Sequence, residues 1–150
     1  MKINKLKTIT TKLSMLSLFC TLSVQATTCP TLNEIQITCT KEKNYNVCSF
    51  SANSQGTIWS DTDKYTGIDL PGKITHFVDV EVKTNTPIKK GTISGKLNSC
   101  VYTTKDGLEI FLDPKINKVT IQLDGNWKKD KHKIYYCNKN IENCKFEFIS

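Results

Sequence analysis

Residues 73–83 read KITHFVDVEVK, and the side chains along this stretch alternate in character from its start to its end. Period two is the repeat of a β-strand, whose successive side chains point to opposite faces of a sheet. The alternation therefore predicts a strand over residues 73–83. We expect one face to carry the mainly apolar set Ile74, His76, Val78, Val80 and Val82, which places His76 at the edge of the core.

Short runs of the same kind lie on both sides of this stretch and are separated by turn residues. We expect strands at 34–40, 45–52, 57–60, 91–104, 108–112, 118–123, 132–137 and 145–149. Residues 60–72 and 85–90 are expected to be a loop and a turn, with tighter turns at Lys105-Asp106-Gly107 and Asp124-Gly125-Asn126. This pattern predicts an all-β, single-domain fold of about eight or nine strands, arranged as an antiparallel β-sandwich or an open barrel.

The first 26 residues have the pattern of a cleaved secretory signal peptide. Four lysines are followed by an apolar stretch over residues 13–24, and Val24-Gln25-Ala26 fits the small-x-Ala cleavage pattern. The apolar stretch is well short of the roughly 20 residues of a membrane-spanning helix. We therefore expect a signal peptide at 1–26 and one domain at 27–150, secreted or periplasmic and not membrane-spanning.

The charge of the chain changes when this segment is removed. The full chain has a net charge of +7, and its basic residues are all lysines. Without the four lysines of the signal peptide, 17 lysines stand against 14 acidic residues, a net charge of +3. This mild charge without arginine does not favour nucleic-acid binding, so no nucleic-acid partner is expected.

Six cysteines follow the signal peptide, as expected of a chain that forms disulfides in an oxidising compartment. Cys39 and Cys48 flank one polar turn, and Cys137 and Cys144 flank another, which favours two local bridges; Cys29 and Cys100 would then pair over a long span. The sequence alone leaves all fifteen pairings open. The Cys-x2-Cys spacing of zinc and redox sites is absent, so no metal site is expected.

Catalytic patterns are also missing from the sequence. His76 and His132 are its two histidines, and neither belongs to a known nucleophile or metal motif. We therefore expect no catalytic residue, no cofactor and no enzymatic activity.

Aromatic and cationic side chains combine at one place, around a lysine-rich run near the C-terminus. This candidate binding surface consists of Trp127, Lys128, Lys129, Lys131, His132, Lys133 and Tyr135. The aromatic rings could stack on a glycan, and the lysines could meet an anionic lipid head group or an acidic glycan. A protein ligand is the third alternative.

A set of short motifs spans most of the mature chain: Cys29-Pro30-x4-Ile35, Phe50-Ser51-Ala52 with Gly56-x2-Trp59, Phe77, Cys100-x-Tyr102 and a late Trp127. Their order resembles a family of small exported proteins of unknown function from Gram-negative bacteria. The resemblance implies a β-rich single domain with Cys29 paired to Cys100, and it implies no activity. The Cys39–Cys48 and Cys137–Cys144 pairs would be additions to that family pattern.

These observations together lead us to expect an exported binding factor for an envelope or host-surface ligand. The alternative is a secreted inhibitor of an enzyme such as a lysozyme or a protease, because a rigid disulfide-bonded loop loses little entropy on binding.

Overall fold

A computed structural model describes residues 26–61 and 64–149. The predicted signal peptide therefore lies outside the described residues, apart from Ala26. The described chain contains eleven strands and one short 3-10 helix: β1 (Ile35–Glu42), β2 (Tyr45–Ser54), β3 (Thr57–Asp61), β4 (Tyr65–Gly67), β5 (Ile74–Lys83), β6 (Thr92–Thr104), β7 (Glu109–Pro114), β8 (Lys118–Gln122), β9 (Lys128–Lys129), β10 (Ile134–Cys137), η1 (Ile141–Asn143) and β11 (Glu147–Phe148). The all-β prediction is confirmed.

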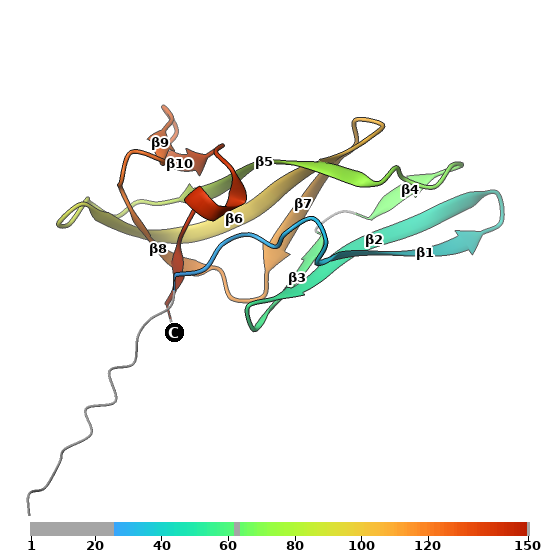
Figure 1. The fold of residues 1–150 in the computed structure, drawn as a ribbon, viewed down its shortest axis with the longest axis horizontal. Helices are drawn as coiled ribbons and strands as arrows, with labels where there is room; N and C mark the ends of the chain where they lie inside the picture. The colour runs from blue at the N-terminus through green and yellow to red at the C-terminus, as the bar shows by residue number, and fades with distance from the viewer. Residues whose placement is uncertain (1–25, 62–63, 150) are drawn as a thin grey trace, which may run out of the picture.

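The strands form one open antiparallel sheet built around the long central strand β6 (Figure 1). One edge of β6 pairs with β5, which continues to β10 and β9. The other edge pairs with β8 over its first half and with β7 over its second half, so the sheet divides into two arms there. One arm runs from β8 to β11, and the other runs from β7 through β3 and β2 to β1, with β4 also on β2.

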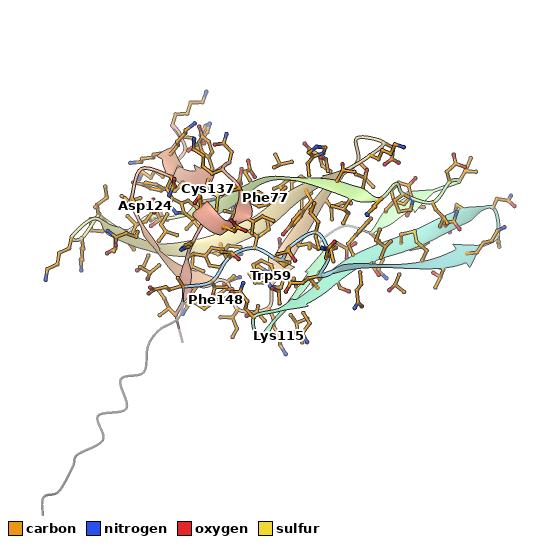
Figure 2. The ribbon with its side chains drawn as sticks, viewed as in Figure 1. Trp59, Phe77, Lys115, Asp124, Cys137 and Phe148 are labelled. Carbon is orange, nitrogen blue, oxygen red and sulfur yellow. A yellow bond between two sulfur atoms is a disulfide. The ribbon has the colours of Figure 1, made fainter. Side chains whose placement is uncertain are left out.

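The two arms pack against each other through aromatic rings and enclose the core. The ring of Trp59 on β3 lies 6.4 Å from Phe146 and 6.2 Å from Phe148, centre to centre. Figure 2 shows Trp59 and Phe148 close together beside the central strands. Trp59 is fully buried and Phe146 nearly so, and edge-on ring contacts of this kind are favourable in cores. A single sheet therefore provides both faces of its own core.

All three expected disulfides are present. Cys29–Cys100 ties the N-terminal segment to β6 across 71 residues, whereas Cys39–Cys48 and Cys137–Cys144 close short segments. In the chain-entropy model the long bridge contributes about 4 kcal/mol to stability and each short bridge about 2.5 kcal/mol.

The strand predicted at 73–83 exists, but the faces predicted for its first half are wrong. The pairing of β5 with β6 shifts between Ile74 and His76, and again between Phe77 and Asp79. At each shift β5 contains one extra, unpaired residue, which reverses the faces to which the side chains after it point. His76 is therefore exposed and does not lie at the core edge, while Phe77 packs against Tyr102 at 5.7 Å. Further along, Val80 and Val82 are buried as expected.

The remaining differences are short elements without an alternating pattern. The expected loop at 60–72 contains the three-residue strand β4, and the lysine run contains β9. The turn at Lys105-Asp106-Gly107 is confirmed: Gly107 has a φ of +83°, and β6 pairs with β7 beyond it. Glycine adopts this left-handed conformation without the cost that a Cβ atom would add.

Candidate functional site

The aromatic residues of the predicted binding surface are buried, whereas its cationic residues are exposed. Trp127 and Tyr135 are only 7% and 5% exposed, and both belong to the core. Little of either ring is therefore exposed for stacking on a ligand. The exposed members of the set are Lys128, Lys129, Lys131, His132 and Lys133.

The lysine run is organised as a turn around one carboxylate. Asp130 accepts hydrogen bonds from the backbone N–H groups of Ile134 and His132, both at 2.8 Å. These hydrogen bonds, with that from Ile134 contributing most, lower the pKa of Asp130. The Nζ atom of Lys129 lies 5.7 Å from the centre of the Tyr135 ring, a cation–π contact. A cavity of about 240 Å³ is lined by Lys129, Lys133 and Tyr135, so this region offers two cations and one mostly buried ring at a small hollow.

A larger hollow of about 440 Å³ lies elsewhere, between the N-terminal segment, the start of β5 and the loop that contains η1. Its apolar lining consists of Leu32, Phe77 and Ile141, all partly buried and packed against the core. Polar residues surround them: Thr28, Thr31, Thr75, His76, Lys139, Asn140 and Glu142. We call this hollow, with these ten residues, the groove.

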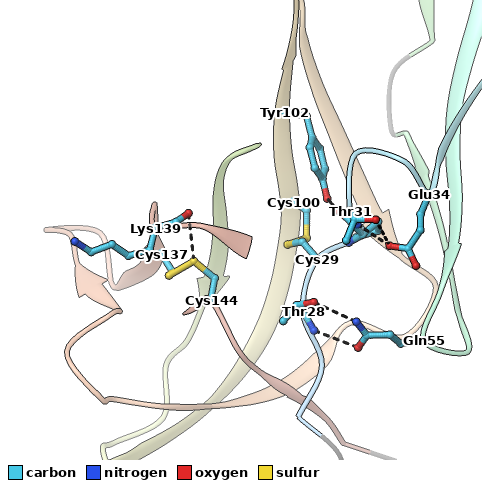
Figure 3. Close-up of a disulfide and its surroundings, with 11 residues drawn as sticks. Thr28, Cys29, Thr31, Glu34, Gln55, Cys100, Tyr102, Cys137, Lys139 and Cys144 are labelled. Atoms are coloured by element: carbon cyan, nitrogen blue, oxygen red, sulfur yellow. Dashed lines mark hydrogen bonds between the residues drawn. A yellow bond between two sulfur atoms is a disulfide. The ribbon is translucent and has the colours of Figure 1, made fainter. Parts of the chain in front are cut away.

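The N-terminal wall of the groove is fixed by covalent and polar links (Figure 3). Cys29 is bonded to Cys100, and next to it the Tyr102 hydroxyl donates a 2.6 Å hydrogen bond to the carbonyl of Pro30. Burial, with a smaller effect from the nearby Glu34, raises the pKa of Tyr102, so this hydroxyl keeps its proton. The wall therefore does not depend on the groove being filled.

Glu34 closes the same segment on its outer side. Its carboxylate accepts hydrogen bonds from the N–H and hydroxyl of Thr31 at 2.7 and 2.8 Å, and from Ser54 at 2.9 Å. Partial burial acts to raise the pKa of Glu34, but these hydrogen bonds outweigh it and lower the pKa. Gln55 adds a pair of hydrogen bonds with Thr28, which tie the segment to the turn between β2 and β3.

The opposite wall is the short segment closed by Cys137–Cys144. Its 3-10 turn is held by backbone hydrogen bonds from Asn143 to Asn140 and from Cys144 to Ile141. Lys139 and Glu142 place one positive and one negative charge at the rim. His76 is exposed on the β5 side, with its Nδ1 atom 2.9 Å from the Thr75 hydroxyl. The groove thus combines an apolar floor with a polar rim of mixed charge.

Sequence reasoning missed the groove because its lining comes from three segments that are far apart in the chain. Leu32, Phe77 and Ile141 share no motif, and each sits in a different local pattern. The predicted disulfides supplied a partial signal, since they bring the segment around Cys29 onto β6 and close the loop after Cys137.

One titratable group is unusual and lies on the sheet between its edges. Burial first, and then the negative charges of Glu81 and Glu109, raise the pKa of Asp79 to about 6. Its Oδ1 atom is buried and has no hydrogen-bond partner among the described residues.

Within residues 26–61 and 64–149, no group of three or more His, Cys, Asp or Glu side chains could hold a metal ion. The same residues include no helix that is long and apolar enough to cross a membrane.

Comparison with known families extends over nearly the whole chain. The family model described as "Protein of unknown function (DUF3757)" matches residues 23–147. The chain belongs to the DUF3757 family. The match includes all six paired cysteines and every residue of the groove. Neither a search of curated proteins nor a search of solved structures finds a match.

Proposed function

We propose that this DUF3757 protein is an exported binding protein that takes an apolar side chain of a partner protein into the groove. The observation that carries the proposal is the apolar floor of Leu32, Phe77 and Ile141 inside a hollow of about 440 Å³. Ligand pockets of proteins typically have volumes of roughly 300–1,000 Å³ and are mostly apolar with a few polar groups.

The chemistry of the lining favours a protein partner over the other ligands considered. An anionic lipid or acidic glycan is attracted by a surface of one charge, whereas the rim carries both Lys139 and Glu142. Stacking on a sugar ring is not supported at Trp127, because that ring is buried. An apolar centre with a polar rim is the pattern of protein–protein contact sites.

The rigidity of the walls adds to this argument. Disulfides hold the segment around Cys29 and the loop that ends at Cys144, so little ordering entropy is lost when a partner binds. Disulfides are typical of proteins outside the cytoplasm. We place the partner on a Gram-negative envelope or on a host surface, reached through export by the predicted signal peptide, and we propose binding without catalysis.

The test uses the folded, disulfide-bonded protein and a library of displayed peptides. We expect selected peptides to carry large apolar side chains and to lose binding to Ile141→Asp, which puts a charge on the groove floor. The matched control is Ile116→Asp, an equally apolar residue that is 54% exposed between β7 and β8, outside the groove. Peptides that bind Ile141→Asp as well as the unchanged protein would contradict the proposal.

A second candidate function, enzyme inhibition, is favoured by the tip of the β1–β2 hairpin. The Cys39–Cys48 bridge lies just behind the turn at 43–44, and the Tyr45 hydroxyl donates a hydrogen bond to Glu42 at 3.2 Å. A hairpin tip that is held by a disulfide in this way can enter the active site of a lysozyme or protease. Inhibition in a panel of these enzymes should be lost in Lys41→Ala/Lys43→Ala and kept in Ile141→Asp; no inhibition by the unchanged protein rejects this candidate.

A further inference from the structure

Strand β1 forms an open edge of the sheet. It is the terminal strand in the order β1-β2-β3-β7-β6-β5-β10-β9, and every residue from Gln36 to Glu42 is exposed. Among the described residues, no backbone hydrogen bond from another segment reaches its outer side. The backbone groups on the outer side of β1 therefore face solvent along this edge of the described chain.

The register shows which backbone groups these are. Cys39 and Cys48 lie directly opposite each other with their Cα atoms 4.1 Å apart, which is the short spacing of a pair that does not exchange hydrogen bonds. The pairing of β1 with β2 runs without a shift from Ile35 to Glu42. The N–H and C=O groups of Ile35, Ile37 and Cys39 therefore point away from β2.

The first six residues of β1 lack the side chains that usually protect a free strand. From Ile35 to Thr40 there is no charge and no proline, whereas edge strands are commonly protected by lysine, proline or bulges. Ile35 and Ile37 lie opposite Ala52 and Phe50, which are buried, so the core face of the sheet continues onto β1. Ile37 remains 39% exposed there. Both the hydrogen bonding and the apolar face are incomplete at this edge.

We infer that β1 pairs with β1 of a second copy of this chain, antiparallel and two-fold symmetric, with Ile37 opposite Ile37. A two-fold contact requires a self-complementary surface. The outward groups lie on odd-numbered residues, so only registers that place odd residues opposite odd residues can form the ladder. Centred on Ile37, the pairing sets Ile35 against Cys39 and Glu34 against Thr40, which joins apolar to apolar and avoids like charges.

Registers shifted toward the C-terminal end of β1 are disfavoured by its charged residues. Shifting the pairing so that Ile37 faces Cys39 places Glu34 opposite Glu42, and like charges directly opposite are destabilising. A further shift places Ile37 opposite Lys41. A shift the other way leaves only residues 35–37 of β1 within the pair. The Ile37-centred register is therefore the one the sequence favours. One pair of strands buries less area than a standard stable interface, so the dimer should dissociate on dilution.

The first measurement is amide hydrogen exchange by NMR in the unchanged protein, at high and low concentration. We expect the N–H groups of Ile35, Ile37 and Cys39 to be protected at high concentration and to exchange freely on dilution. The amides of Gln36, Thr38 and Thr40 face β2 and should be protected at both concentrations, which makes them an internal control. Free exchange at Ile37 under conditions where dimers are present would overturn the inference.

The second measurement is sedimentation velocity over a concentration series. We expect the unchanged protein to move from monomer to dimer, and Ile37→Lys to stay monomeric, because a charge would then lie on the two-fold axis. The control is Ile58→Lys, which adds the same charge at a residue that is 56% exposed on the inner strand β3. A protein that is monomeric throughout, or a dimer that survives in Ile37→Lys, would reject pairing through β1.

Discussion

The two ends of the sheet differ in almost every property that governs whether a free strand attracts another chain. Figure 1 shows β1 and β9 at opposite ends of the molecule. β1 has eight residues, the first six without charge, and is stapled to β2 by a disulfide. β9 has two residues, both lysines, and leads into the turn held by Asp130. The comparison shows one sheet with one protected edge and one unprotected edge.

Each of these edges has a local disulfide nearby, which allows a matched test of how the ends are held. Cys39–Cys48 joins β1 to β2, and Cys137–Cys144 starts from β10, the neighbour of β9. Because the loops they close are of similar length, we expect Cys39→Ala/Cys48→Ala and Cys137→Ala/Cys144→Ala each to lower the free energy of unfolding by about 2.5 kcal/mol. Chemical denaturation followed by fluorescence measures both.

A difference between the two double variants would show that the two ends of the sheet are not held in the same way. A loss confined to faster amide exchange in β1, with the global unfolding free energy unchanged in Cys39→Ala/Cys48→Ala, would mean that the hairpin opens as a separate unit. The β1–β2 hairpin would then be mobile, and β1 would not offer a fixed edge for pairing with another chain.

Between the edges, Asp79 gives the sheet a dependence on pH. Its raised pKa, about 6, means that the folded state binds more protons than the unfolded state between pH 4 and 6, so this residue lowers stability as the pH rises through that range. At pH 7 we expect Asp79→Asn to raise the free energy of unfolding by about 1 kcal/mol, a value reduced for the partial exposure of the group.

The measurement is the difference in unfolding free energy between Asp79→Asn and the unchanged protein at pH 4 and pH 7. Taking this difference removes the opposite contributions of Glu34, Asp106 and Asp130, whose pKa values are lowered in the folded state. An equal difference at both pH values would show that the carboxylate of Asp79 does not titrate as inferred.

The strands and the two short disulfides could be predicted from the sequence because their signals are local. Alternation over residues 73–83 identifies a strand, and short polar turns between cysteines identify the local bridges. The register shifts at Thr75 and Val78 leave no trace in that alternation, so the exposure of His76 and the inward position of Phe77 could not be predicted.

Predicted sites were less reliable because they depend on contacts between distant segments. Trp127 stands next to a lysine run, which suggested a surface, yet its ring belongs to the core. The groove depends on Leu32, Phe77 and Ile141 meeting in space, which no spacing in the chain reports. Edge strands are likewise a property of the whole sheet, since β1 is an edge only because nothing pairs beyond it in the described chain.

A double substitution in β9 tests whether charge or short length keeps this edge from pairing with another chain, and we expect a small effect. In Lys128→Thr/Lys129→Thr the edge loses both charges but stays two residues long. The lost cation–π contact of Lys129 with Tyr135 should lower the free energy of unfolding by about 0.5 kcal/mol. We expect no new self-association in sedimentation velocity, because two residues offer too few backbone groups for a ladder. If dimers appear in this variant and are unaffected by Ile37→Lys, then charge protects β9, and the difference between the two edges is one of side chains and not of strand length.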